Sequence, residues 1–173
     1  MTHRLRALEL SDIETLMAWE NHTDQWEVSL RTSPFSRSVL EQYITAAAAD
    51  FWEIGQVRFV LCRIQDSSAL GLVDVFNASA LHSKAEVGLL INSEYRGQGL
   101  GPIALKLVQD WAIRYAMLDQ LYAQIFSDNL AACKAFKKTG FGEIGRWKQW
   151  IKAPSGNKDV VLMQWIKANN EPL

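Results

Sequence analysis

The chain has 173 residues, of which 49% are hydrophobic and 21% are charged, and its formal net charge is -1. A length of this order suits one compact domain that buries roughly 70% of its unfolded surface, so no disulfide or metal is needed for stability. The near-neutral charge argues against a broad nucleic-acid-binding face, and no apolar run reaches the roughly 20 residues that span a bilayer.

The N-terminus and the cysteines indicate the compartment. Met1–Leu10 carries four charged or titratable side chains and lacks the apolar run of a signal peptide. Cys62 and Cys133 lie in apolar or helical patterns without metal-ligand spacing, which is typical of thiols in a reduced core. We therefore expect a cytoplasmic protein of one domain, residues 1–173, without a metal and without a membrane partner.

The first fifty residues predict one strand and two helices. Arg4–Leu8 alternates charged and apolar residues, as a half-buried strand does. Ser11 and Glu14 have the spacing of a capping box, so a helix should run from there to about Glu20. A second helix is predicted from Ser36 through the alanine run to about Asp50.

The middle of the chain predicts three strands followed by a glycine-rich loop and a helix. The strands are Val57–Ile64, Ala69–Phe76 and Ala85–Ile91, and the first two are joined by a turn. After the loop, apolar residues recur at helical spacing from Ile103 to Tyr115.

The last third adds strands and one more helix. Gln120–Phe126 is strand-like, Asn129–Lys138 is helical, and Gly140 is placed as a left-handed helix terminator. Two final strands, Phe141–Ile151 and Asp159–Ile166, should form a hairpin. The fold class is therefore α/β (α+β), with about seven strands and about four helices in a single domain.

The glycine-rich loop Arg96–Gly101 lies between a strand and a helix. Small residues there let backbone N–H groups approach an anion, and the helix N-terminus favours negative charge, so the loop suits a pyrophosphate, although a plain turn is the alternative. A P-loop is disfavoured because Pro102 and Ile103 stand where lysine and a hydroxyl are needed. The G-x-G-x-G spacing also departs from the dinucleotide fingerprint.

Arg96-x-x-Gly99-x-Gly101 resembles the Q/R-x-x-G-x-G/A motif of the GNAT (Gcn5-related N-acetyltransferase) superfamily. Glu86–Ile91 is similar to the fourth strand of that superfamily, and the helix from Asn129 to Gly140 to its closing motif. The resemblance covers nearly the whole chain. Gly71–Asn77, together with the start of the chain, resembles the branch of spermidine and ribosomal-protein N-terminal acetyltransferases.

The resemblance implies a mixed, mostly antiparallel sheet that is splayed between its fourth and fifth strands. It implies transfer of an acetyl group from acetyl-CoA, without a metal, to an amine of a polyamine-like small molecule or of a protein N-terminus. A CoA-binding sensor or structural protein with little turnover is the alternative, and self-association is left open.

The resemblance also implies a set of cosubstrate-binding residues. Leu89, Leu90 and Ile91 would offer backbone N–H groups to the pantetheine arm and the thioester oxygen. Asn129 would bond the pantetheine, although a helix N-cap is its alternative role. Phe136 would flank the arm near the sulfur. The pyrophosphate would be held by Arg96, Gly97, Gln98, Gly99, Leu100, Gly101 and Pro102, with Pro102 at the first helical position.

Many members of the superfamily carry a proton-donating tyrosine at the position of Phe136, and phenylalanine cannot replace it. Ser127, Tyr122 and water are the donors left open. Glu86 is the candidate base, acting through water, with a strand-edge salt bridge as the alternative.

Other polar and aromatic residues are candidates on the acceptor side. His22 and His82 are alternative bases. An acidic cluster that would attract a cationic amine comprises Glu20, Asp24 and Glu27, and either Trp19 or Trp26 would line the acceptor pocket.

Overall fold

A computed structural model describes residues 2–22, 33–47, 49–153 and 156–168. The strands are β1 (His3–Ala7), β2 (Val57–Arg63), β3 (Ala69–Ser79), β4 (Lys84–Ile91), β5 (Gln120–Phe126), β6 (Gly142–Ala153) and β7 (Gly156–Ile166). The helices are α1 (Ile13–Glu20), α3 (Arg37–Ala46), α4 (Phe51–Ile54), α5 (Leu100–Arg114) and α6 (Leu130–Lys138), with short 3-10 turns at Leu10–Asp12 and Ser93–Tyr95.

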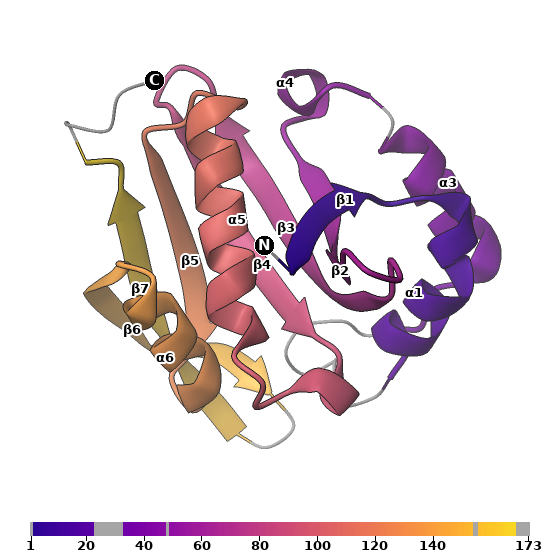
Figure 1. The fold of residues 1–173 in the computed structure, drawn as a ribbon. Coiled ribbons are helices and arrows are strands. Elements are labelled where there is room, and N and C mark those ends of the chain that lie inside the picture. The colour runs from indigo at the N-terminus through magenta and orange to yellow at the C-terminus, as the bar shows by residue number, and fades with distance from the viewer. Residues whose placement is uncertain (1, 23–32, 48, 154–155, 169–173) are drawn as a thin grey trace.

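The strands form one seven-stranded sheet in the order β1-β2-β3-β4-β5-β7-β6. Every neighbouring pair is antiparallel except β4 and β5, which are parallel. The β4–β5 ladder joins only Lys84–Glu86 to Gln120–Tyr122, although both strands continue beyond it. The predicted mixed sheet, splayed between its fourth and fifth strands, is therefore confirmed (Figure 1).

Side chains alternate across the sheet and fill a core on each face. One face, with Leu61, Val73 and Val87, packs against α5 and α6, which lie across β4, β5 and β7 in Figure 1. The other face, with Val60 and Leu72, is covered by α1 and α3. Helices α1 and α3 cover the β1–β3 side of this second face, and no other helix of the described residues packs on it beside β4 and β5.

The start of α1 differs from the prediction. Ser11 and Glu14 do not form a capping box. Instead, the Glu9 N–H donates a hydrogen bond to Asp12 Oδ2 at 3.0 Å, and the same oxygen accepts a hydrogen bond from Arg6 Nη1 at 2.7 Å. Glu14 pairs with Arg37 of α3 instead. The buried Asp12 carboxylate offers a stronger acceptor than the serine hydroxyl, so the cap forms there.

The predicted helix Ser36–Asp50 is wrong beyond Ala46. Ser36 does cap α3, accepting from the Val39 N–H at 3.4 Å, but α3 ends at Ala46. Asp50 starts the separate turn α4 by accepting from the Trp52 N–H at 2.9 Å. An aspartate side chain that bonds a nearby N–H competes with continuation of a helix, and the alanine-rich composition hid that signal.

The remaining elements agree with the prediction in type and shift at their ends. Helix α5 begins at Leu100, three residues before the predicted start, because Gly99 caps it with φ 76°. Gly140 has φ 91° and follows α6, as predicted. The closing hairpin β6–β7 is present, and β6 has register shifts that include one between Trp147 and Ile151.

Candidate functional site

A cavity of about 700 Å³ opens where β4 and β5 separate. Val87, Gly88, Leu89 and Leu90 line one wall, directly after the last rung of the ladder, and Gln124, Ile125 and Phe126 line the other. Side chains from β4 itself and from α1, α3, β2, β3 and α6 also line the cavity, among them Glu20, Tyr43, Arg58, Asp74, Asn77, Glu86, Asn129, Ala132 and Phe136. The splay of the sheet is therefore the opening of the candidate site.

One end of the cavity carries an ion-pair cluster that the sequence interpretation did not find. Arg58 on β2 donates from Nε to Asp74 Oδ1 at 2.5 Å and from Nη1 to Glu20 Oε1 at 2.5 Å, and its guanidinium lies 5.2 Å from the ring centre of Tyr43. Burial by itself lowers the pKa of Arg58, but the charges of Asp74 and Glu20 outweigh it and raise that pKa. Arg58 therefore stays charged.

This cluster carries more negative than positive charge. Glu20 and Asp74 share the single cation Arg58, and Glu86 lines the same cavity. Among the described lining residues, acidic side chains thus outnumber basic ones. Of the predicted acidic cluster, Glu20 lines the cavity, whereas Asp24 and Glu27 lie outside the described residues.

A glycine keeps the space next to Asp74 open. Gly88 pairs with Asp74 across β3 and β4. A Cβ built on Gly88 would lie 3.7 Å from Asp74 Cβ and 3.5 Å from Phe76 Cε1, so a longer side chain would cover the carboxylate. The sequence Glu86-Val87-Gly88 thus places a carboxylate and then a hollow on the same face of β4.

Glu86 lies at the edge of the splay, because the pair Glu86–Tyr122 is the last rung of the β4–β5 ladder. Its side chain is 6% exposed and accepts a hydrogen bond from Asn77 Nδ2 at 3.0 Å. No Lys, Arg or His of the described chain forms an ion pair with it, which disfavours the strand-edge salt bridge. Burial raises the pKa of Tyr122, and the charge of Glu86 and a hydrogen bond to it raise that pKa further.

The β3–β4 ladder decides which backbone groups face the splay. The Asn92 N–H donates to Leu70 O, and the register runs unbroken from there through the pair Leu72–Leu90. In an antiparallel ladder, successive residues point their N–H groups to opposite sides, so the N–H of Leu90 faces β3. Those of Leu89 and Ile91 face the splay, and Leu90 contributes its side chain to the cavity wall.

The glycine-rich loop lies outside this cavity and next to it. Gly97 and Gly99 have positive φ, and a Cβ at either would meet no atom within 4 Å. Gly101 packs closely, since its Cβ would lie 3.3 Å from Ala135 Cβ of α6. The loop therefore presents open backbone at the N-terminus of α5, as an anion site requires.

The side chains of the loop and its first helical turn have separate roles. Arg96 Nε donates to Ile91 O at 3.3 Å and Gln98 Nε2 to Glu94 O at 3.4 Å, whereas the Leu100 side chain is buried in the core. The sequence predicted that Pro102 is the first residue of this helix, but it is the third residue of α5. It is still within the first turn, where N–H groups have no partner in the helix.

Asn129 and Phe136 both reach the cavity from α6. Asn129 caps the helix, since its Oδ1 accepts from the Ala132 N–H at 3.1 Å. The N-cap role of Asn129 is therefore confirmed. Because the cap uses only Oδ1, the amide nitrogen Nδ2 is not needed for it. Phe136 is 2% exposed and packs edge-on against Phe141 with ring centres 4.9 Å apart.

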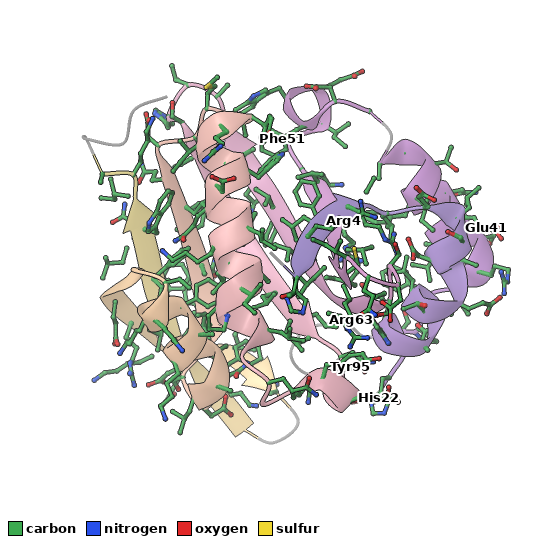
Figure 2. The ribbon with its side chains drawn as sticks, in the orientation of Figure 1. Arg4, His22, Glu41, Phe51, Arg63 and Tyr95 are labelled. Carbon is green, nitrogen blue, oxygen red and sulfur yellow. The ribbon has the colours of Figure 1, made fainter. Side chains whose placement is uncertain are left out.

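Other predicted site residues are not brought into the cavity. Ser127, in the turn after β5, and Tyr122 are absent from the cavity wall, although Tyr122 contacts it through Glu86. Trp19 packs against the α1–α3 core, and Trp26 lies outside the described residues. His22 is exposed just beyond α1 (Figure 2), and His82 is exposed in the β3–β4 turn.

The missed pair Arg58–Asp74 left a signal in the sequence. Both residues interrupt apolar strands that a short turn joins, and in the resulting antiparallel hairpin they stand directly opposite each other. Pairing the predicted strands Val57–Ile64 and Ala69–Phe76 end to end places Arg58 opposite Val75, one residue from Asp74, because the register shift between Leu61 and Cys62 leaves no mark in the sequence.

No group of three or more His, Cys, Asp or Glu side chains is arranged to hold a metal ion in the described ranges. No helix among the described residues is long and apolar enough to cross a membrane.

Comparisons with known proteins agree with this geometry. Spermidine N(1)-acetyltransferase of Escherichia coli K12 is 32% identical over 80 residues, which are 46% of this chain and 43% of that protein, so the match spans less than half of that relative. The enzyme of the same name from Vibrio cholerae is 25% identical over 164 residues, 95% of this chain and 92% of that protein.

A crystal structure of spermidine N-acetyltransferase from Vibrio cholerae in complex with CoA and spermine superposes with a TM-score of 0.87, at 22% identity and with 96% of each chain covered. This similarity establishes the fold. The family model described as the acetyltransferase (GNAT) domain matches residues 3–142, which is most of the chain. The protein therefore belongs to the GNAT acetyltransferase family.

Proposed function

We propose that this protein transfers the acetyl group of acetyl-CoA to a primary amine of a polyamine-like acceptor. The observation that carries the proposal is the cavity at the splay, which joins the carboxylates of Glu86 and Asp74 to the open strand backbone of β4. The names of the relatives, which are spermidine acetyltransferases, support the same acceptor class.

The acceptor end would select a cation. A polyamine carries several ammonium groups, and the carboxylates of Glu20, Asp74 and Glu86 offer them more negative charge than Arg58 offsets. The hollow above Gly88 gives the reacting amine a place between Asp74 and Glu86. Burial strengthens this attraction, because charges interact more strongly where water is excluded.

The cosubstrate end would use backbone more than side chains. Leu89 and Ile91 would donate N–H groups toward the thioester oxygen, and Asn129 would donate its amide to the pantetheine arm. Gly97, Gly99 and Gly101 leave backbone N–H groups accessible for the pyrophosphate at the start of α5, and Arg96 and Gln98 flank it. Phe136 would form the apolar wall beside the sulfur.

The chemistry needs one base and positioned reactants. The ammonium first loses one proton to the base, and its nitrogen then bonds to the acetyl carbonyl carbon as the carbon–sulfur bond breaks. The second proton that the nitrogen loses passes through water to the departing thiolate, so that CoA leaves as the thiol. Glu86 would take the proton from the amine through water. Positioning of the two reactants at one opening supplies much of the remaining acceleration, since well-oriented groups react as if at high concentration.

An acceptor screen with detection of free thiol tests the proposal. Acetyl-CoA is offered with spermidine, spermine, an N-terminal peptide and an aminoglycoside, and we expect thiol release with the polyamines to exceed that with the peptide. Asp74→Asn should raise KM for the polyamine and leave the affinity for acetyl-CoA unchanged. Stabilisation by acetyl-CoA without thiol release from any amine would favour a CoA-binding protein that does not turn over.

Self-association is a further part of the proposal. One structural neighbour is described as dodecameric, and this chain exposes apolar side chains such as Ile144 and Trp150 along the edge strand β6. Light scattering of the purified protein should give a mass several times that of the chain. A monomer at micromolar concentration would contradict this.

A further inference from the structure

Asn77 stands in an uncommon backbone conformation beside the proposed base. Its φ is 51°, and it lies where the pairing of β3 with β4 shifts register between Phe76 and Ser79. Left-handed backbone is uncommon for residues other than glycine, and asparagine is among the few enriched there. The bulge therefore places at this point a residue whose side chain can also form hydrogen bonds.

We propose that Asn77 is a positioning residue of the acetyl transfer, one that holds the Glu86 carboxylate toward the cavity. This inference rests on the function proposed above. Asn77 Nδ2 donates to Glu86 Oε2 at 3.0 Å, and both residues line the cavity. Asn77 is exposed to solvent, whereas Glu86 is buried with 6% of its surface exposed. The hydrogen bond therefore links a buried carboxylate to a residue at the protein surface.

The contact has the chemistry that the role requires. A hydrogen bond donated to a carboxylate stabilises its charged form, and a buried carboxylate needs such a donor. Tyr122 belongs to the same network, because its hydroxyl interacts with both Glu86 and Asn77. Asn77 and Tyr122 thus approach the carboxylate from β3 and from β5, and together they fix its direction.

Other ionisable groups surround the carboxylate and are part of any pH dependence. Lys84 shares its face of β4, Asp74 lies on the neighbouring strand, and Glu20 of α1 and Arg58 of β2 line the same cavity. Arg58 is engaged with Asp74 and Glu20. Among the described residues, two neutral donors therefore serve the Glu86 carboxylate, the amide of Asn77 at 3.0 Å and the hydroxyl of Tyr122.

Glycine separates the backbone role of Asn77 from the role of its amide. Glycine adopts a positive φ easily, so Asn77→Gly keeps the backbone conformation and removes the hydrogen bond to Glu86. If only the backbone conformation of Asn77 matters, the variant should therefore behave as the wild type. Ser67→Gly is the matched control, because Ser67 also has a positive φ, 57°, but lies in the β2–β3 turn and outside the cavity wall.

The experiment is steady-state kinetics with acetyl-CoA and spermidine from pH 6 to 9. Asn77→Gly should lower kcat about tenfold, a fraction of what general base catalysis supplies, and leave KM for acetyl-CoA unchanged. Ser67→Gly should behave as the wild type.

A double mutant completes the test. If Asn77 acts through Glu86, Asn77→Gly should slow the Glu86→Gln variant little further, since residues that act as a unit are not additive. Fully additive losses, or a wild-type kcat in Asn77→Gly, would overturn the role of Asn77 alone. A wild-type protein that releases no thiol with any amine would overturn both this role and the proposed function.

Discussion

Phe136 combines a core position with a wall of the candidate site. It is 2% exposed, stacks edge-on with Phe141, and lines the cavity from α6. The resemblance predicts that Phe136 takes the position of a proton-donating tyrosine, and a phenyl ring at this position can pack but cannot donate a proton.

Phe136→Tyr tests whether protonation of the leaving sulfur limits the rate. We expect kcat to rise severalfold with little change in the affinity for acetyl-CoA, because a hydroxyl at this place would donate to the thiolate. Its cost in stability should be small if the hydroxyl reaches the cavity and about 1–3 kcal/mol if it is buried without a partner.

Turnover with spermidine, a thermal melt and a solvent isotope effect on both proteins measure these quantities. An unchanged or lower kcat in a folded Phe136→Tyr protein would mean that amine attack, product release or another donor controls turnover. That result would direct attention to Tyr122, which interacts with Glu86.

At the scale of elements, the sequence predicted types and order better than it predicted ends. Apolar periodicity located the strands and α5, because burial on one face dictates that pattern. It failed at Asp50, where a single side chain starts a new turn, and at Ser11, where a buried carboxylate three residues after Glu9 replaced the hydroxyl as cap. Local hydrogen bonds of this kind carry no periodic signal.

For the candidate site, too, the sequence located the residues that stand in short motifs and missed those that only the fold brings together. The resemblance located Glu86, Asn129 and the glycine-rich loop, because those residues stand in short motifs. The Arg58–Asp74–Glu20 cluster comes from three separate elements, and Asn77 acts through a bulge, so neither forms a local pattern. Strand register, which the sequence leaves open, decided which of Leu89, Leu90 and Ile91 offers an N–H to the splay.

The loop between β4 and α5 can be tested by charge. Gly101→Glu should abolish acetyl-CoA binding, but any Cβ there also crowds Ala135, so this variant mixes charge with packing. Gln98→Glu adds the same charge at an exposed position of the loop. We expect it to weaken acetyl-CoA binding about fivefold at low salt and less at high salt, because ions screen exposed charges.

Calorimetric titration at two salt concentrations measures the effect. Gln42→Glu is the matched control, since Gln42 is exposed on α3 and lies outside the cavity wall. Equal weakening in both variants, or none in Gln98→Glu, would show that the loop is not the pyrophosphate site.

For the molecule as a whole, the ion pair between Arg6 and Asp12 ties β1 to the start of α1. Burial raises the pKa of Asp12, but hydrogen bonds from Arg6 and from the Glu9 N–H outweigh it, and the pKa is lowered. A carboxyl whose pKa falls on folding stabilises the protein above its unfolded pKa of about 3.9. That stabilisation is lost as the pH falls through the folded pKa.

Asp12→Asn should therefore reduce the free energy of unfolding by about 1–3 kcal/mol at pH 7, the range for hydrogen bonds to charged groups. The difference between variant and wild type should shrink as the pH falls below about 4. Urea denaturation at pH 7 and pH 3 measures it. If the variant and the wild type differ in the free energy of unfolding by the same amount at both pH values, the negative charge of Asp12 does not contribute to stability.

The three-rung ladder between β4 and β5 also has a kinetic consequence for solvent access to the backbone. Beyond Glu86 the amide hydrogens of Leu89 and Ile91 face the splay, whereas that of Leu90 faces β3. In deuterated water, Leu89 and Ile91 should exchange their amide hydrogens quickly and Leu90 slowly, although all three lie in one continuous strand. Acetyl-CoA should slow only the two fast ones, so that alternate residues of β4 report occupancy of the opening while the residue between them serves as the internal standard.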